Sequence, residues 1–316
     1  MIKPGNTPLV ELETFKLGNV HIYAKVEGCN PGGSIKDRVG FWLVKKYIDS
    51  CVKSNTSSKT KTIIEASSGN TGIGVSIACS IYELKCLICV PKSTSQEKIS
   101  IMKSFGATIY QVDGTTDDCI KWCEFTAKLN PDNIVWLNQF DNQECVECHY
   151  KTTAIELYND SIQYTHDTFG KGVWKERDDR NIIVCSMGTT GTIMGLSKRF
   201  KPLGWAIVGV MPQPNVRIEG LKNLQVQRVP KICDIKEIDQ IIQISDVDAL
   251  ITMRELARSE GIMAGPSSGA ALYVASIIAK QYSAEKRRTN IIVILPDRGQ
   301  NYLSQGVWDE KGVMPK

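Results

Sequence analysis

The chain has 316 residues, of which 42% are hydrophobic and 23% are charged, a composition typical of a globular protein with one or two domains. The net charge of +4 is small, and no basic run alternates with aromatic residues, so nucleic acid is not expected as a partner. No apolar stretch approaches the roughly 20 residues of a membrane span. Because the N-terminus carries no export signal, we expect a cytoplasmic protein with reduced cysteines.

Strand and helix patterns alternate along the first half of the chain. The expected strands are residues 21–27, 62–65, 84–90 and 107–112, and the expected helices are residues 39–48, 72–82 and 117–129. A further helix is expected to begin with a capping box formed by Thr94 and Glu97 and to end at Phe105. Helical crossovers of this kind predict a parallel sheet that is covered by helices on both faces.

The second half repeats the pattern. The expected strands are residues 181–186, 206–210 and 290–295, and the expected helices are residues 190–200, 246–260 and 267–281. We expect a smaller N-terminal domain at residues 1–140, with an early segment near residues 13–34 that crosses to the other domain. The C-terminal domain is expected at residues 141–316.

A glycine- and threonine-rich turn lies between an expected strand and an expected helix. Its residues are Gly188, Thr189, Thr190, Gly191 and Thr192. Consecutive backbone N–H groups in such a turn, together with the helix dipole, suit a phosphate. The turn is neither a Walker loop nor a dinucleotide fingerprint, because the lysine of the first and the glycine spacing of the second are absent. A tight strand-to-helix turn without a ligand explains the residues equally well.

A second polar loop has the same position relative to its strand. It consists of Ser67, Ser68, Gly69, Asn70, Thr71 and Gly72. Backbone N–H groups and hydroxyls at a helix start can hold a carboxylate. An ordinary N-cap is the alternative, although the loop has more polar residues than a cap needs.

Lys36 follows another turn, Asn30-Pro31-Gly32-Gly33-Ser34-Ile35, and Ser267 opens an expected helix. Taken singly, Lys36 would be a surface lysine and Ser267 a helix cap. Together with the phosphate-type turn, an amine and hydroxyl-rich loops are what a pyridoxal phosphate (PLP) site requires. A serine or cysteine triad is disfavoured because none of the three histidines neighbours a suitable motif.

Two CxxC pairs were considered as metal or redox sites. Cys86 and Cys89 lie in an expected strand, where their side chains point to opposite faces. Cys145 and Cys148 are followed by His149, which formally matches a haem attachment pattern. Neither pair predicts a metal site, and a redox role for the second pair stays open.

These segments resemble the cysteine synthase and cystathionine β-synthase family of fold-type II PLP enzymes. The resemblance rests on stretches spread along the chain: Gly5 to Val10, Asn30 to Arg38, Glu65 to Gly72, Gln139-Phe140 with His149-Tyr150 and Thr152-Thr153, Ser186 to Thr192, Gly265 to Ala270, Pro296 to Gly299, and Tyr302 to Ser304. Thr190 and Asp297-Arg298-Gly299 resemble the B-type bacterial cysteine synthases, whereas Pro296 resembles the A-type.

The resemblance implies an α/β fold with two open, twisted, mostly parallel sheets, helices on both faces and an active site between the domains. It implies that Lys36 holds PLP as a Schiff base and is the catalytic base. It also implies that Gly188 to Thr192 bind the phosphate, that Ser267 contacts the pyridine nitrogen, and that Asn70 contacts the ring oxygen. The substrate carboxylate would then be held by Ser67, Ser68, Gly69, Asn70, Thr71 and Gln139.

The implied reaction is a β-replacement that makes L-cysteine from O-acetyl-L-serine or O-phosphoserine and sulfide or thiosulfate through an aminoacrylate. Cystathionine β-synthase or serine sulfhydrylase activity stays open, as do a serine or threonine dehydratase and a PLP-binding protein without turnover. The resemblance further implies a homodimer, with a serine acetyltransferase as a further candidate partner. The sulfur donor and the leaving group are not determined by the sequence.

Overall fold

The computed structural model describes residues 2–58, 61–169 and 179–309. The chain forms two compact units. The first comprises Met1–Pro4 and Asn30–Cys148, and the second comprises Gly5–Cys29 and His149–Lys316. The division into functional domains at residues 140 and 141 stays a prediction. No helix in the described part of the chain is long and apolar enough to cross a membrane.

The first unit is built on a four-stranded parallel sheet of order β5-β4-β3-β6 among the described residues. Its strands are β3 (Thr62–Ala66), β4 (Cys86–Pro91), β5 (Thr108–Val112) and β6 (Ile134–Trp136). Ile63 pairs with Cys86 of β4, and Ile64 pairs with Trp136 of β6. All four strands therefore end at the same edge of the sheet, and the loop that begins at Ser67 follows β3 there.

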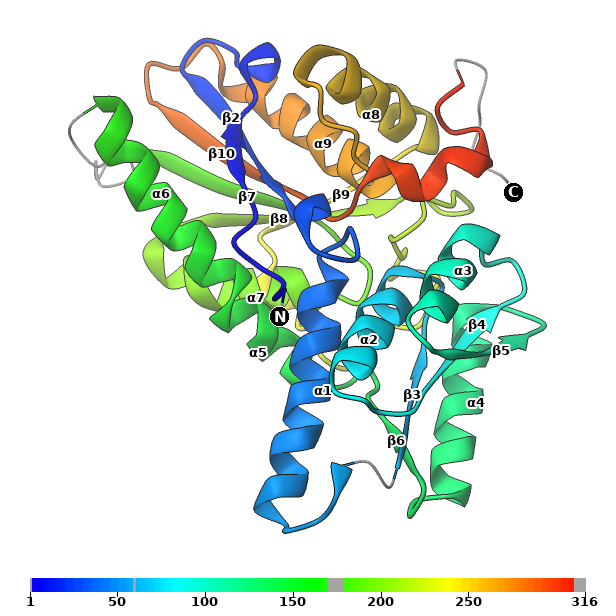
Figure 1. Ribbon diagram of the computed structural model, residues 1–316. Helices are drawn as coiled ribbons and strands as arrows, with labels where there is room; N and C mark the ends of the chain where they lie inside the picture. Colours follow the sequence, from blue (N-terminus) through cyan, green and yellow to red (C-terminus); the bar gives the residue numbers. More distant parts are fainter. Residues whose placement is uncertain (1, 59–60, 170–178, 310–316) are drawn as a thin grey trace. The chain divides into compact units, whose positions relative to one another are not determined.

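Helices cover both faces of this sheet. They are α1 (Lys36–Lys53), α2 (Asn70–Ile81), α3 (Gln96–Ser104) and α4 (Thr116–Leu129). Helix α5 (Glu144–Lys151) contains the boundary between the two units. Helices α1 and α2 lie on one side and α4 on the other (Figure 1). Because strand side chains alternate between faces, Ile64 and Ala66 of β3 pack with Cys119 and Ile120 of α4.

The capping box expected at Thr94 and Glu97 is wrong. Helix α3 begins one residue later, with Ser95 at the N-cap, and the Ser95 side chain makes no capping hydrogen bond. A capping box is instead present at α4, where Thr115 and Asp118 satisfy each other's backbone N–H groups. Both places have a threonine followed three residues later by an acidic residue, so this pattern alone does not determine where a capping box forms.

The second unit contains a six-stranded sheet of order β1-β2-β10-β7-β8-β9 in the described residues. Its strands are β1 (Leu9–Glu11), β2 (Val20–Val26), β7 (Arg180–Ser186), β8 (Ala206–Pro212), β9 (Gln240–Ile244) and β10 (Thr289–Leu295). Only β1 is antiparallel to its neighbour. Strand β2 comes from the start of the chain but pairs with β10, so this pairing joins segments that are far apart in sequence.

The helices of the second unit are α6 (Thr153–Phe169), α7 (Gly191–Phe200), α8 (Asp246–Glu260) and α9 (Pro266–Tyr282). Figure 1 shows α8 and α9 on one side of the sheet and α6 and α7 on the other. The short 3-10 helices are Glu13–Phe15, Glu27–Cys29, Lys201–Leu203, Ile235–Glu237 and Gly299–Gln305. Every residue of β10 is buried, as a central strand between two helix layers requires.

The predicted fold class is confirmed: two mainly parallel sheets with helices on both faces. Five elements were not predicted. They are β1, β6, β9, α5 and α6. The three strands are short or partly exposed edge strands, so they lack the continuous apolar run that marks a buried strand.

Helices α1 and α2 approach each other at two glycines. A Cβ added at Gly40 would lie 2.3 Å from the carbonyl carbon of Gly74, and a Cβ added at Gly74 would lie 2.6 Å from the carbonyl oxygen of Lys36. Real Cβ atoms do not approach backbone this closely, so only glycine permits the packing. The contact holds the first turn of α1, which carries Lys36, against the second turn of α2.

We expect Gly40→Ala to lower the free energy of unfolding. Alanine favours a helix interior by roughly 1 kcal/mol over glycine. The backbone collision with Gly74 costs more, and we expect a net destabilisation of about 2 kcal/mol. Urea titration followed by circular dichroism measures the change. Lys45→Ala, on the exposed side of the same helix, is the control and is expected to change stability by less than about 0.5 kcal/mol. Equal stability of Gly40→Ala and wild type would contradict this account.

Candidate active site

Lys36 is the first residue of α1, and the preceding turn is tightly organised. The Asp37 carboxylate accepts a hydrogen bond from the Gly32 backbone N–H at 2.6 Å. A Cβ at Gly32 would lie 2.6 Å from an Asp37 oxygen, so glycine is required there for the carboxylate to reach the backbone. The Lys36 backbone N–H donates to Ser34 Oγ at 3.2 Å. These contacts fix the position from which the partly buried Lys36 side chain extends.

The loop between β3 and α2 is folded around the Ser67 side chain. Ser67 Oγ accepts hydrogen bonds from the backbone N–H groups of Gly69 at 3.1 Å and of Gly72 at 3.0 Å. Helix α2 begins at Asn70, its N-cap is Gly69, which has no side chain, and Ser67 Oγ satisfies only the Gly72 N–H of its first turn. Helix N-termini attract anions because their first N–H groups have no partner within the helix. The loop therefore has the geometry expected of a carboxylate site.

Gln139 connects the two ends of this loop. Its side-chain nitrogen donates to the Ala66 carbonyl at 2.8 Å, and its side-chain oxygen accepts from Thr71 Oγ1 at 2.5 Å. Gln139 and Thr71 are both buried. The structure thus brings Gln139 together with the Ser67 to Thr71 loop, from which it is far removed in sequence.

Two buried ionisable residues in this unit were not predicted. Lys98 of α3 is 1% exposed, and its Cδ lies 2.5 Å from where a Cβ of Gly69 would be. Glu65, at the end of β3, is fully buried, and one of its oxygens accepts a hydrogen bond from the Ala66 N–H at 3.0 Å. No sequence signal marks Lys98, because a lysine on an amphipathic helix is normally solvent-exposed.

The second unit holds the phosphate-type turn. It follows β7 and opens α7, whose N-cap Thr190 is in the left-handed region with φ +66° and makes no side-chain capping hydrogen bond. A Cβ at Gly188 would lie 2.4 Å from the Gly220 carbonyl oxygen, so Gly188 lets a second loop approach. The Lys222 backbone N–H also donates to the Met187 carbonyl at 2.8 Å. The loop around Gly220 is a part of this site that the sequence reasoning missed.

Ser267 lies beside this turn in the same unit. Its carbonyl accepts a hydrogen bond from Ser186 Oγ, at the end of β7, at 2.6 Å. Gly220 has φ +89°, and a Cβ added to it would lie 3.6 Å from the Ser267 side chain. Ser267 itself is buried, in the first turn of α9. The structure therefore brings Ser267 close to the turn of Gly188 to Thr192, and their joint role in binding a cofactor stays a prediction.

The residues present fit PLP. The uncapped N-terminus of α7 and the glycine-lined turn offer backbone N–H groups to a phosphate. The neighbouring Ser267 offers a hydroxyl of the size and polarity that a pyridine nitrogen needs. Among the described residues, no group of three or more His, Cys, Asp or Glu side chains is arranged to hold a metal ion.

The cysteine pairs are buried. All eleven cysteines lie in the described residues, and none is in a disulfide bond. Burial raises the pKa of the Cys145 thiol well above its ordinary value, and the nearby charge of Lys36 lowers it by a smaller amount. Because the thiolate is the reactive form, Cys145 does not have the environment of a redox-active cysteine.

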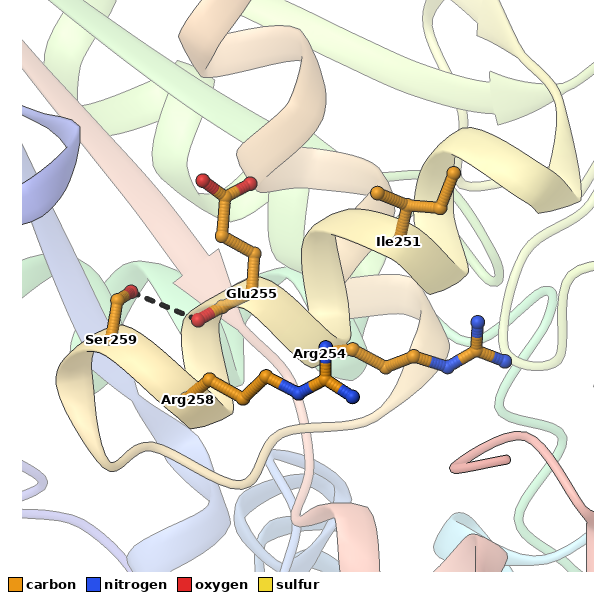
Figure 2. Close-up of a pocket in the computed structure, with 5 residues that line it drawn as sticks. All are labelled: Ile251, Arg254, Glu255, Arg258 and Ser259. Carbon is orange, nitrogen blue, oxygen red and sulfur yellow. Dashed lines mark hydrogen bonds between the residues drawn. The ribbon is translucent and has the colours of Figure 1, made fainter. Parts of the chain in front are cut away.

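A cavity of about 450 Å³ lies beside α8, and Figure 2 shows the side chains that line it. It is lined by Ile251, Arg254, Glu255, Arg258 and Ser259. Arg254 Nε donates to the Val307 carbonyl at 2.9 Å, so this side chain is committed to the local structure. None of the lining residues was expected in the site.

The chain was compared with protein families and with known proteins. A family model described as "Pyridoxal-phosphate dependent enzyme" matches residues 2–297. A cysteine synthase of Aquifex aeolicus (strain VF5) is 32% identical over 97% of this chain and 91% of the relative. An O-acetylserine dependent cystathionine beta-synthase of Bacillus subtilis (strain 168) is 33% identical over 96% of this chain and 95% of the relative.

The structural comparison agrees. The crystal structure of a hydrogen sulfide-producing enzyme from Fusobacterium nucleatum superimposes with a TM-score of 0.81 and 32% identity, covering 95% of this chain and 97% of that one. The chain therefore belongs to the fold-type II pyridoxal-phosphate-dependent enzymes, in the cysteine synthase and cystathionine β-synthase family. Its cofactor is pyridoxal phosphate.

Glu65 generates a pH prediction. Burial raises its pKa from 4.5 to about 8, against a smaller opposing effect of hydrogen bonds from the backbone. The folded chain therefore keeps this proton between pH 4.5 and about 8, where the unfolded chain has lost it. The contribution of Glu65 to the free energy of unfolding is complete at low pH and is lost as the pH rises through that window.

We expect Glu65→Gln to remove this contribution to the pH dependence. The stability difference between Glu65→Gln and wild type should shift in favour of the variant, by roughly 2–4 kcal/mol, between pH 5 and pH 8. Denaturant midpoints measured at several pH values test it. Glu124→Gln, an exposed carboxylate of α4, is the control, and its stability difference from wild type should vary much less over the same range. A constant difference for Glu65→Gln would show that Glu65 does not titrate in this window.

Proposed function

We propose that the protein catalyses PLP-dependent β-replacement on an O-activated L-serine, with L-cysteine as the product. The observation that carries the proposal is Ser267, a neutral hydroxyl residue grouped with the phosphate-type turn. A hydroxyl next to the pyridine nitrogen, unlike a carboxylate, does not stabilise the protonated form of that nitrogen. The unprotonated ring withdraws less electron density than a protonated ring would. This favours elimination and replacement at the β-carbon over transamination.

The roles of the chain's residues follow from their chemistry. When bound, PLP supplies an electron-withdrawing ring that stabilises negative charge at the α-carbon of an amino acid. The Lys36 amine would hold the cofactor, and its Nζ would accept the proton from the substrate α-carbon. Gly188, Thr189, Thr190, Gly191 and Thr192 hold the phosphate, Ser267 contacts the pyridine nitrogen, and Asn70 contacts the ring oxygen.

The substrate carboxylate is assigned to the loop after β3. Ser67, Ser68, Gly69, Asn70 and Thr71 form the loop at the start of α2 that would hold it. Gln139 keeps this loop in shape by accepting the Thr71 hydroxyl hydrogen and donating to the Ala66 carbonyl. An anion at this position gains from the α2 dipole. Binding the carboxylate also orients the α-carbon, so the proton that leaves it has a fixed direction.

We expect Lys36→Ala to abolish turnover and to remove the covalent link to the cofactor. The alanine side chain has no amine to hold PLP or to accept the α-proton. Borohydride reduction of the wild-type holoenzyme, followed by peptide mass mapping, should place the cofactor on Lys36. Lys46→Ala, which removes a different α1 lysine, is the control and should leave both results unchanged. A cofactor-modified peptide other than that of Lys36 would remove this residue from its assigned role.

We propose O-acetyl-L-serine as the amino-acid substrate and sulfide as the sulfur donor. The relative from Aquifex aeolicus is named a cysteine synthase, which supports this choice. O-phosphoserine and thiosulfate are alternative partners of the same reaction. A second function is favoured by the Bacillus subtilis relative, which is named an O-acetylserine dependent cystathionine beta-synthase and so supports homocysteine as an alternative acceptor.

A substrate panel separates these choices. O-acetylserine, O-phosphoserine and serine are each combined with sulfide, thiosulfate and homocysteine, and product formation is measured by mass spectrometry. We expect the highest kcat/KM for O-acetylserine with sulfide. A higher kcat/KM with homocysteine would establish the cystathionine-forming alternative. Release of ammonia and a keto acid without a sulfur donor would instead indicate a dehydratase.

The proposal extends to the assembly and location. Family resemblance supports a homodimer that works in the cytoplasm, with a serine acetyltransferase as a candidate partner.

A further inference from the structure

His149 links two buried threonines in the second unit. Its Nδ1 lies 2.9 Å from Thr153 Oγ1, at the start of α6, and its Nε2 lies 3.3 Å from Thr192 Oγ1, in the first turn of α7. The exposed fractions are 1% for His149, 0% for Thr153 and 7% for Thr192. The three side chains therefore form a row of polar groups that ends at the phosphate-type turn.

The direction of these hydrogen bonds decides what Thr192 can offer a phosphate. A threonine hydroxyl has one hydrogen, and phosphate oxygens are acceptors. If Thr192 donates its hydrogen to His149, it has none for the phosphate. If His149 donates from Nε2, Thr192 accepts that hydrogen bond and its own hydrogen is available for the phosphate.

The direction of the hydrogen bond between Thr153 and His149 decides between these two arrangements, because a threonine hydroxyl can donate to Nδ1 or accept from it. In a neutral imidazole one nitrogen donates and the other accepts. A hydrogen bond donated by Thr153 Oγ1 to Nδ1 requires Nδ1 to be the acceptor, so the ring proton lies on Nε2. The buried row then runs in one direction, from the Thr153 hydroxyl through the imidazole to Thr192.

We propose that His149 and Thr153 are positioning residues for the cofactor phosphate: they fix the Nε2-protonated tautomer of His149 and so keep the Thr192 hydroxyl oriented as a donor. This inference rests on the assignment of Thr192 to the phosphate in the proposed function. Neither His149 nor Thr153 contacts the reacting atoms. Both act on cofactor affinity through the hydroxyl of Thr192.

A double-mutant cycle on cofactor affinity tests the row. The PLP dissociation constant is measured by equilibrium dialysis of wild type, His149→Leu, Thr192→Val and the double variant. We expect each single variant to bind PLP roughly tenfold more weakly, as the loss of one hydrogen bond to a charged group implies. The double variant should bind no more weakly than Thr192→Val, because His149 has no effect without the hydroxyl.

Conservative variants are the matched controls. His149→Gln retains an N–H donor near the position of Nε2 and should stay within about threefold of wild type. Thr153→Ser retains the hydroxyl and should bind PLP like wild type, whereas Thr153→Val has nearly the same shape but no donor and should bind more weakly. These pairs keep the test valid if His149→Leu fails to fold.

The tautomer is read directly by ¹⁵N NMR of the imidazoles in the holoenzyme. The chain has three histidines, so the spectrum of His149→Gln assigns the signals of His149 by difference. We expect a protonated Nε2 and a bare Nδ1 in wild type and in Thr153→Ser, and a mixture of tautomers in Thr153→Val. A wild-type His149 protonated only on Nδ1 would overturn the inference.

The outcomes also separate this inference from the proposed function. If Thr192→Val leaves PLP affinity unchanged, Thr192 does not hold the phosphate, and both the site assignment and the inference fail. If Thr192→Val weakens binding but His149→Leu and Thr153→Val do not, only the inference fails. Full additivity of His149→Leu and Thr192→Val would likewise reduce His149 to a general packing role.

Discussion

The close approach of α1 and α2 at Gly40 and Gly74 is the constraint on which the first unit depends. Helices normally keep their axes 8–10 Å apart because side chains separate them. Here backbone meets backbone, with the Lys36 carbonyl against Gly74. The first residue of α1 and the start of α2 are thereby held in one arrangement. Lys36, the proposed cofactor lysine, and the loop proposed to bind the substrate carboxylate lie at these two places.

The second unit also holds its proposed binding residues in place, but through contacts between loops rather than through close helix packing. Its phosphate-type turn is held by loops distant in sequence: the carbonyl of Gly220 packs on Gly188, and Ser186 bonds to Ser267. The His149 row adds a third support from α5 and α6. A ligand that binds to backbone N–H groups needs them rigid before it arrives, since ordering them on binding would subtract from affinity.

Buried polar groups explain much of how the two loops keep their shape. Ser67, Thr71 and Gln139 satisfy one another or the backbone, so the loop after β3 contains its own hydrogen-bond partners. Lys98 lies across Gly69, where any side chain would displace it. Glu65 remains protonated at neutral pH because its burial destabilises the charged form more than its hydrogen bonds stabilise it. Ser67, Gln139 and Glu65 are thus each hydrogen-bonded to the neighbouring backbone.

Local patterns predicted most of the fold. Short apolar runs predicted the central strands, and the alternation of strands with helices predicted the parallel class. Edge strands such as β9, with an exposed Gln240, lack that pattern, and α3 begins one residue later than its polar residues indicated. The turns rich in glycine, serine and threonine were recognised because a phosphate or carboxylate site needs small residues at consecutive positions. This requirement can be read from the sequence alone.

The chain's residue order was sufficient for the class of chemistry, since a lysine, two turns rich in glycine and hydroxyl residues, and a serine at a helix start occur as short contiguous motifs. It could not reveal the partners of these motifs. The pairing of Gln139 with Thr71, of Gly220 with Gly188 and of His149 with Thr192 joins segments that are far apart in the chain. Such contacts arise only when the strands pair and the helices pack, because the neighbours of a side chain are then set by the register of the sheet rather than by distance along the sequence.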